Sequence, residues 1–221
     1  MADASGYIKP YLQTRPDVTE GIPERVEADP ECAKAKREVI ALLPDDIDGY
    51  ILSIGPAAGW ELDELRKRCE KSTNILGVTP FEEEAELCRA LGHTCVIGDM
   101  HKLACLWSGM FSLVFASHVL EHSPAPYVAL REFYRMLRPG GYVQIVTPEP
   151  YGVIHLGDIE RAKRHVDIPE HIFLPSAETL IVMLRKAGFN FLRYSEVAQT
   201  CQGKLNYWHR VWLAQKPSEV T

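Results

Sequence analysis

The sequence alternates short apolar runs with longer amphipathic stretches, and this alternation constrains its fold more than any other feature. The apolar runs are bounded by turn residues and are too short to be helices, which predicts buried strands. The stretches between them space their apolar residues at helical intervals. Strands that alternate with helices form parallel sheets, because each parallel crossover needs a helix to cover one face. The predicted fold is therefore α/β: a doubly wound, mostly parallel seven-stranded sheet with helices on both faces.

The elements are expected in a definite order. Strands are predicted at 50–54, 74–78, 93–97, 111–116, 142–146, 189–194 and 207–214. Helices are predicted at 30–43, 60–71, 82–91, 127–137 and 177–186. Ser176 is the expected N-cap of the last helix and Gly188 its C-terminal stop. No helix separates the last two strands, so we expect them to pair as an antiparallel hairpin.

Size and composition set the domain organisation. A chain of 221 residues that is 46% hydrophobic is predicted to form one domain, which we assign to 30–221. Residues 1–29 form an irregular N-terminal segment that either folds as a lid over the pocket or is disordered. A second irregular interval, 148–170, is interpreted as a substrate-covering insertion.

Several classes of protein are disfavoured by composition. No apolar run approaches the roughly 18 residues of a membrane span, and no export signal is recognisable at the N-terminus. The six cysteines form no C-x-x-C pair, which argues against a zinc ribbon or a disulfide scaffold and favours reduced thiols. A net charge of -6 without a basic tract disfavours a nucleic-acid partner. The expected location is the cytoplasm, with no membrane partner.

The first strand-to-helix loop, Gly55-Pro-Ala-Ala-Gly59, is the expected ligand contact. In doubly wound sheets the ligand lies beyond the carboxyl ends of the strands, next to this loop. Glycine at both ends of the loop lets the backbone approach a ligand closely, and the following helix offers free N–H groups. The loop therefore predicts a cofactor pocket.

Residues 51–61 resemble the glycine-rich first motif of class I S-adenosylmethionine-dependent methyltransferases. Further matches follow in the family's order, at 74–79, 98–103, 111–122, 138–141, 169–173 and 184–189. The resemblance thus reaches almost from end to end. It implies a Rossmann-like fold, S-adenosylmethionine as the cofactor, and methyl transfer as the activity.

The resemblance also implies roles for single residues. The loop residues Gly55, Ala57 and Gly59 would lie against the amino-acid half of the cofactor, and Ser117 would border its methionine portion. Asp99 would lie near the adenine amino group. The remaining positions expected at the cofactor are Trp60 beside the loop, Thr79 at the ribose, and Met100 on the adenine ring.

Three positions depart from the family's pattern. Ala57 replaces the usual middle glycine, a mild change if its φ is negative. Ser53 stands where an acidic residue is frequent, and Thr79 stands where a carboxylate usually binds both ribose hydroxyls. Either Glu82 or Glu83 reaches back to replace that carboxylate, or cofactor affinity is reduced.

Two other functions compete with methyl transfer. A nicotinamide-dependent oxidoreductase would need G-x-G-x-x-G, whose later glycines would fall on Ala57 and Trp60. A catalytically inactive methyltransferase-like domain that serves as a binding or regulatory subunit is the second alternative, motivated by Ser53 and Thr79. A cofactor-binding assay separates this alternative from the enzyme.

The candidate catalytic residues are histidines, because a hydroxyl acceptor must lose a proton whereas a neutral amine need not. His122 is the first choice of base, followed by His118 and His171. Capping or packing beside the cofactor is the favoured explanation of His118 and His122, and a structural hydrogen bond explains His171 at least as well as catalysis does.

A metal site formed by His171 with its sequence neighbours is not predicted. His165, Asp167 and Glu170 would be the other ligands, but their spacing matches no metal motif and a solvated loop explains them. No metal is therefore expected.

The class of methyl acceptor is inferred from a motif that the sequence lacks and from its net charge. No Asn-Pro-Pro-Tyr motif follows the fourth strand, which disfavours methylation of exocyclic amines on DNA bases. Together with the charge, this favours a small-molecule acceptor with a hydroxyl or an amine. The acceptor atom and the oligomeric state stay open at this point.

Overall fold

The computed structural model describes residues 30–57, 59–104, 106–149, 171–201 and 204–218. The predicted lid at 1–29 and nearly all of the predicted insertion at 148–170 lie outside the described residues. His165, Asp167 and Glu170 lie outside them too.

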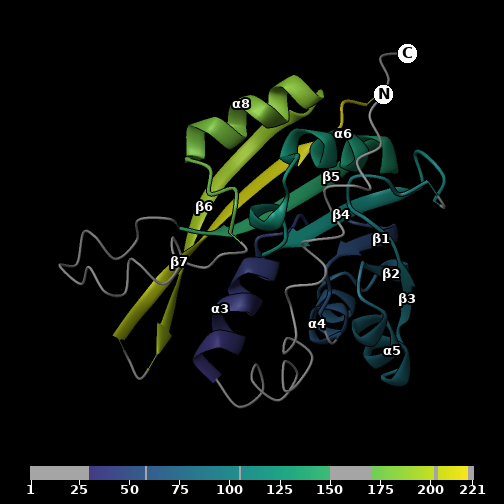
Figure 1. The fold of residues 1–221 in the computed structure, drawn as a ribbon, viewed down its shortest axis with the longest axis horizontal. Coiled ribbons are helices and arrows are strands. Elements are labelled where there is room, and N and C mark those ends of the chain that lie inside the picture. Colours follow the sequence, from purple (N-terminus) through teal and green to yellow (C-terminus); the bar gives the residue numbers. More distant parts are fainter. Residues whose placement is uncertain (1–29, 58, 105, 150–170, 202–203, 219–221) are drawn as a thin grey trace.

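Seven strands form one sheet in the order β3-β2-β1-β4-β5-β7-β6 (Figure 1). Their bounds are Gly49–Ile54 (β1), Ser72–Thr79 (β2), Thr94–Ile97 (β3), Phe111–Ser117 (β4), Leu137–Pro148 (β5), Asn190–Cys201 (β6) and Lys204–Gln215 (β7). The strands from β1 to β5 are parallel, and β7 runs antiparallel to both of its neighbours. The predicted doubly wound α/β sheet and its antiparallel C-terminal hairpin are confirmed.

Helices cover both faces of this sheet. Their bounds are Pro30–Ala41 (α3), Trp60–Arg68 (α4), Glu82–Ala90 (α5), Pro126–Met136 (α6) and Ala177–Ala187 (α8), with a short 3-10 helix at Leu120–His122 (η1). The helices α3, α4 and α5 lie on one face, and α6 and α8 on the other (Figure 1). The hydroxyl of Ser176 accepts from the Thr179 N–H at 3.2 Å, so the predicted N-cap of α8 is confirmed.

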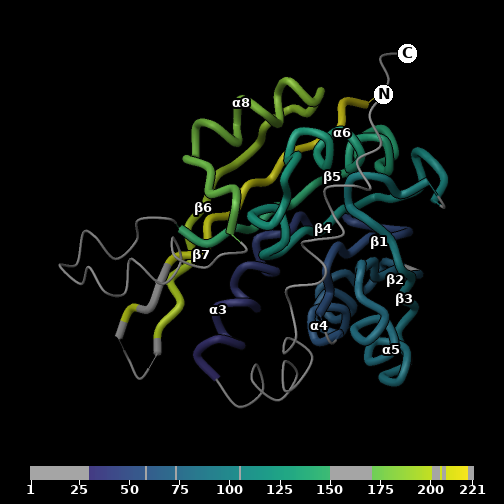
Figure 2. Tube along the Cα trace, viewed as in Figure 1, coloured from purple at the N-terminus to yellow at the C-terminus, as the bar shows by residue number. Residues whose placement is uncertain are grey.

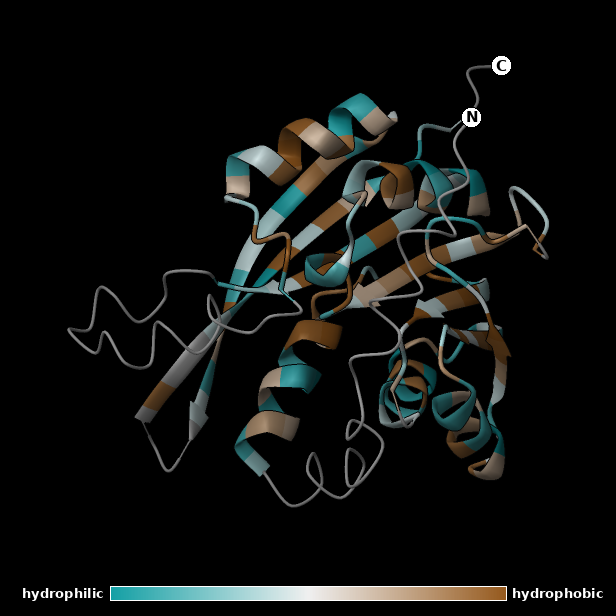
Figure 3. Ribbon diagram, viewed as in Figure 1, coloured by the Kyte–Doolittle hydropathy of each residue, from teal (hydrophilic) through white to brown (hydrophobic). Residues whose placement is uncertain are grey.

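The core is divided by the sheet into two clusters, because successive residues of a strand point to opposite faces. In β1, Leu52 packs with α6 and α8, whereas Ile51 packs with α3, α4 and α5. Hydrophobic residues accordingly run along the central strands, and hydrophilic ones gather on outward helix turns (Figure 3). Both faces of the sheet are buried, as a parallel sheet requires.

Several element boundaries differ from the prediction, among them those of α4 and β5. The α4 helix ends at Arg68 rather than at 71. Residues 138–141, which the prediction left between a helix and a strand, lie inside β5, and the β4–β5 register shifts between Phe111 and Leu113.

The C-terminal hairpin is longer than predicted and projects beyond the other strands (Figure 2). The β6 and β7 strands pair from Asn190↔Gln215 out to Cys201↔Lys204, whereas β7 pairs with β5 only as far as Pro148↔His209. His209 therefore lies where the hairpin leaves the sheet. Within the described part of the chain, no helix has both the length and the apolar composition that crossing a membrane requires.

The strand order reverses between β1 and β4. From β1 the chain adds β2 and β3 on one side and then crosses to place β4 on the other. Ligands of doubly wound sheets bind outside the carboxyl ends of the strands at such a reversal. The fold therefore places the expected ligand site among the residues that follow β1 and β4.

Candidate active site

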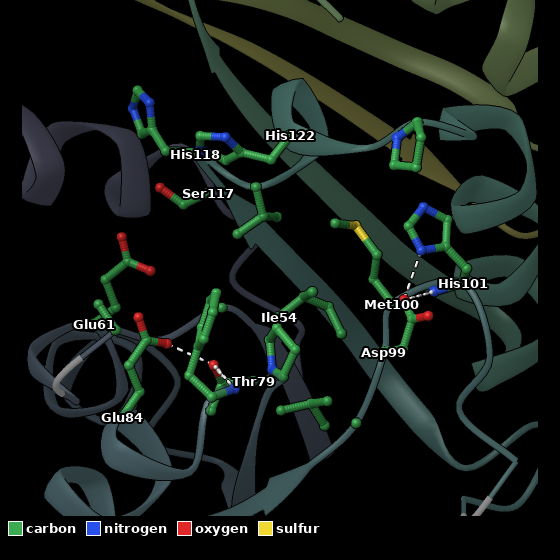
Figure 4. A pocket seen from close by; sticks show the side chains of 18 of the residues that line it. Ile54, Glu61, Thr79, Glu84, Asp99, Met100, His101, Ser117, His118 and His122 are labelled. Carbon is green, nitrogen blue, oxygen red and sulfur yellow. Dashed lines mark hydrogen bonds and ion pairs between the residues drawn. The ribbon is translucent and has the colours of Figure 1, made fainter. Parts of the chain in front are cut away.

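A cavity of about 230 Å³ opens at this reversal. Its wall is formed by residues at the carboxyl ends of β1, β2 and β4 and by the loop after β3. Glu61, Glu84 and Thr79 lie on one side of it, Met100 and Asp99 on the other, and Ser117, His118 and His122 across the end (Figure 4). Most residues predicted at a cofactor are thus brought to one cavity.

The glycine loop lies at the base of the cavity in a conformation that requires glycine. Gly55 has a φ of 65° and donates its N–H to the Val78 carbonyl at 2.7 Å. A Cβ on Gly55 would lie 2.3 Å from Cγ1 of Val119. Gly59 has a φ of 93°, and a Cβ there would lie 2.9 Å from the His93 ring. Both glycines are therefore required by sterics as well as by φ.

Ala57 does not have the negative φ that would make it a mild replacement for glycine. Its φ is 49°, in the left-handed region that costs a non-glycine residue about 1–2 kcal/mol. The Cys88 thiol donates to the Ala57 carbonyl at 3.1 Å. A hydrogen bond with Cys95, together with burial, raises the pKa of the Cys88 thiol, so it stays protonated and can donate. Tertiary contact thus offsets the local cost.

Neither Glu82 nor Glu83, the predicted replacements for the ribose carboxylate, is among the described residues that line the cavity. Glu82 pairs with Arg89 at 3.1 Å near the surface, and Glu83 is exposed. Glu84 instead is buried, lines the cavity, and accepts a hydrogen bond of 2.5 Å from the Thr79 hydroxyl. The reason is helical phase, because Glu84 belongs to the face of α5 that packs on the sheet.

A second carboxylate that was not predicted enters from the first turn of α4. Glu61 is 6% exposed, and its Oε1 lies 3.3 Å from Nζ of Lys36 on α3. Its Oε2 is buried, and no residue in the described ranges offers it a hydrogen bond. The hydroxyl of Ser53, where the family often has an acidic residue, is likewise buried without a partner among them. Glu61 therefore adds a second carboxylate to the cavity wall.

Asp99 and Met100 form the opposite wall. Oδ1 of Asp99 accepts from the His101 backbone N–H at 3.0 Å and contacts Nδ1 of His101 at 2.6 Å. Burial raises the pKa of Asp99, but these hydrogen bonds and the nearby imidazole lower it more, so the net pKa lies below its ordinary value. Nε2 of His101 contacts the Ser123 hydroxyl at 2.6 Å, which fixes the ring. Asp99 is therefore an ionised acceptor with an anchored neighbour.

Trp60 does not lie where it was predicted. It is absent from the described residues that line the cavity. Its ring lies under two cations of α3, with Nζ of Lys36 at 5.9 Å and the Arg37 guanidinium carbon at 5.6 Å from the ring centre. At the start of α4, the Trp60 side chain thus packs against α3.

His118 and His122 lie at the end of β4, as predicted. His118 has a φ of 54° and donates its N–H to the Val146 carbonyl at 2.9 Å. Its Nδ1 lies 3.3 Å from Oε1 of Glu121, and its Nε2 lies 2.7 Å from Nδ1 of His209. Because both ring nitrogens have partners, His118 suits a positioning role better than that of a base. His122 lines the cavity from η1.

His171 lies outside the cavity wall but beside His122, with ring centres 5.0 Å apart. The N–H groups of the next two residues, Ile172 and Phe173, both donate to the Glu121 carbonyl at 2.9 Å. The segment that leads into α8 is thereby tied to η1.

The residues of the site that were not predicted include Glu61, Glu84, Glu121 and His209. Glu84 could have been found from its position in α5, because it lies about one helical turn before Cys88 and therefore shares the buried face of the helix with Cys88 and Ala85. No local signal marks Glu121 as buried. His209 is likewise brought to the site only by the sheet order.

The chain matches the family described as the methyltransferase domain over residues 27–194. It is 26% identical over 158 residues to a tRNA U34 carboxymethyltransferase of Desulfotalea psychrophila, covering 66% of this chain and 47% of that protein. It is also 26% identical over 159 residues to a malonyl-[acyl-carrier protein] O-methyltransferase of a Marinomonas species, and this match covers 70% of this chain and 57% of that protein. The chain thus spans about half the length of these relatives.

Solved structures share the fold. The putative methyltransferase in complex with the Trm112 methyltransferase activator of Haloferax volcanii superposes with a TM-score of 0.71. The sequence identity is 15%, and the match covers 88% of this chain and 93% of that one. At this identity the likeness concerns the fold alone.

Proposed function

Because the chain belongs to the family of methyltransferase domains, whose cofactor is S-adenosylmethionine, we propose that it transfers a methyl group to a small acceptor molecule. The observation that carries this proposal is a cavity at the strand reversal with three carboxylates, Glu61, Glu84 and Asp99, in its wall. Among the described residues of that wall, the only lysine or arginine is Lys36. Such a wall suits a cationic cofactor.

Asp99 and Met100 are proposed to hold the adenine. The Asp99 Oδ1 atom receives both contacts from His101, which leaves Oδ2 as the acceptor for the adenine amino group. Met100 presents a polarisable thioether to the same cavity, suited to packing on a ring.

Glu84 is proposed to supply the ribose carboxylate that the end of β2 lacks. The 2.5 Å hydrogen bond from Thr79 fixes the carboxylate at the cavity wall, and a carboxylate binds hydroxyl donors more strongly than a threonine hydroxyl does. Reduced cofactor affinity, the other outcome predicted for Thr79, is then not required.

Glu61 and the glycine loop are proposed to hold the amino-acid half. Gly55 lines the cavity and lets the backbone approach this half closely, and Ala57 keeps the loop in the same left-handed conformation, whereas Gly59, which was predicted to lie against this half, is not among the described lining residues. Oε2 of Glu61 is a buried acceptor that the cofactor's ammonium group would satisfy. Ser117 lines the cavity at the end of β4 and is proposed to border the methionine portion of the cofactor.

The cofactor supplies an activated methyl group, which an acceptor atom displaces in line. The chain contributes alignment and, for a hydroxyl acceptor, a place for the proton. His122 is proposed as that base because it lines the cavity, whereas His118 is proposed to position η1 through its contacts with Glu121 and His209.

The acidic wall and the net charge of -6 support a small acceptor over a polyanion. Transfer RNA is the second candidate, favoured by the relative that is named for its action on tRNA. An acceptor attached to a carrier protein is favoured in the same way by the malonyl-carrier relative.

The cofactor assignment is tested by calorimetric titration with S-adenosylhomocysteine. Glu84→Gln should weaken binding by about 10- to 100-fold, as expected for a lost hydrogen bond to a charged group. Glu83→Gln, a change at the exposed neighbour on the same helix, should leave binding unchanged. Equal affinities for the two variants would remove Glu84 from the site, and no binding by the wild type would favour the inactive binding domain.

The acceptor class is tested by transfer of labelled methyl groups from S-adenosylmethionine. Separate reactions would contain a panel of small phenols, catechols and amines, total tRNA, and acyl carrier protein. Label in a small molecule alone is expected. Label in tRNA or carrier protein alone would replace the small-molecule acceptor.

A further inference from the structure

The most unusual charge in the described part of the molecule is the Glu121 carboxylate, whose side chain is fully buried. Glu121 lies in η1, between the end of β4 and the start of α6. A carboxylate in such a place is costly unless a positive charge and hydrogen bonds compensate it. The groups around it therefore indicate what it binds.

Three imidazoles surround this carboxylate. Nδ1 of His118 lies 3.3 Å from its Oε1. One ligand atom each from Glu121, His122 and His171 lie within 4.8 Å of one another. The rings of His122 and His171 meet at an angle of 61° rather than stacking, so their edges can converge on one point. The carboxylate of Glu121 and the imidazoles of His122 and His171 thus place three possible ligand atoms around one point.

We propose that Glu121, His122 and His171 bind a divalent transition-metal ion. Two imidazole nitrogens and one carboxylate oxygen are donors that zinc and its neighbours in the first row prefer, whereas magnesium and calcium prefer oxygen alone. Ligands of a tetrahedral zinc ion lie about 3.4 Å apart, so binding would draw the three groups together by about 1 Å. This site shares only His171 with the cluster that the sequence argued against.

Hydrogen bonds around the three proposed ligands hold their side chains and backbone in place. The N–H groups of Ile172 and Phe173 donate to the Glu121 carbonyl, which brings His171 to η1. His118 contacts Glu121 on one side and His209 on the other, and Nε2 of His209 lies 2.9 Å from Oε1 of Gln199. Such outer contacts orient metal ligands and are a regular part of metal sites.

The position of the site suggests a use that rests on the proposed function. His122 belongs to the cavity wall, so an ion with three protein ligands would lie at this edge of the cavity, and the ion would then replace the His122 imidazole as the means of activating a hydroxyl, because a ligating nitrogen cannot also take the proton. Coordination favours loss of the hydroxyl proton to solvent. The oxygen then forms its bond to the methyl carbon as the carbon–sulfur electron pair returns to sulfur. Among small acceptors, this favours hydroxyl compounds over amines.

The test is metal binding by the full chain after treatment with a chelator. Zn²⁺ is titrated calorimetrically, and Co²⁺ is followed by the visible absorption of a low-symmetry site. One equivalent per chain is expected in the wild type. Mg²⁺ should bind at least about tenfold more weakly.

Variants decide whether these residues are the ligands. His171→Ala should weaken Zn²⁺ binding at least about tenfold. Ile172→Ala, which changes the exposed neighbour in the same segment, should not. Glu121→Gln should also weaken binding, and thermal melts show whether this buried change still folds. No stoichiometric binding by the wild type, or equal binding by His171→Ala, would overturn the metal site.

A parallel titration with S-adenosylhomocysteine separates the two proposals. Cofactor binding without metal binding overturns the metal site alone. Metal binding without cofactor binding supports the metal site and overturns the proposed function.

Discussion

The two sides of the cavity are assembled over different distances along the chain. The cofactor side takes its residues from consecutive strand–helix units between β1 and the loop after β3, so each group follows soon after the strand that positions it. The acceptor side joins His118 to His209, 91 residues later, and His122 to His171. The cofactor side is thus built from residues that are close in sequence, and the acceptor side from residues that only the tertiary fold brings together. Substitutions on the two sides should therefore have separable effects on cofactor affinity and on turnover.

The largest expected effect lies on the acceptor side. His122→Asn should lower the turnover of a hydroxyl acceptor by about 10²- to 10⁴-fold, the range typical of a lost general base. Affinity for S-adenosylhomocysteine should change by less than about twofold, because the cofactor side is built by other elements. Steady-state kinetics and calorimetry on the same preparation measure both quantities. Parallel losses of turnover and affinity would show that the two sides are not separable.

The next effect belongs to the glycine loop. Gly55→Ala combines a positive φ with a contact of 2.3 Å to Val119, so the free energy of unfolding should fall by about 2–4 kcal/mol. Gly49→Ala is the matched control, since Gly49 has a φ of 80° and an added Cβ there would meet nothing within 4 Å. That variant should lose only about 1 kcal/mol and keep its cofactor affinity. Denaturant melts of equal midpoint would show that the Val119 contact relaxes at little cost.

A smaller effect is expected from the pH dependence of the Asp99 contact. Because the folded pKa of Asp99 lies below its ordinary value, the ionised group stabilises the fold at pH values above the unfolded pKa, about 3.9. This contribution is lost as pH falls through the lower folded pKa. Its size should be about 1.5 kcal/mol, at the low end for charged hydrogen bonds, since the side chain is 33% exposed.

The measurement is the difference in unfolding free energy between the wild type and Asp99→Asn from pH 6 to pH 2. The difference should be constant down to about pH 4 and then shrink. A difference that grows on acidification would contradict the lowered pKa.

The smallest effect should come from Trp60. Its position in the sequence predicts a contact with the cofactor, but its side chain packs against Lys36 and Arg37 of α3. Trp60→Phe should leave affinity for S-adenosylhomocysteine within about twofold. Stability should fall by about 0.5–1 kcal/mol through the weaker cation–π contact with Lys36 and Arg37. A large loss of affinity with unchanged stability would restore Trp60 to the cofactor site.

The sequence by itself determined the fold class and the position of the loop beside the candidate cofactor cavity. Period-two and helical patterns are local, so the strands, the helices and the hairpin followed from them, with errors confined to ends such as that of α4. The glycine loop could be located for the same reason. Its conformation could not, because the φ of 49° at Ala57 depends on surrounding contacts, among them that with Cys88 on α5.

Only the tertiary structure decided which side chains complete the site. The choice of Glu84 over its two neighbours depended on which face of α5 packs on the sheet. The burial of Glu121 depended on η1 being enclosed by distant segments, and the approach of His209 depended on β7 pairing beside β5. Spacing along the chain carries information about neighbours in one element, whereas burial and long-range pairing arise when separate elements pack together.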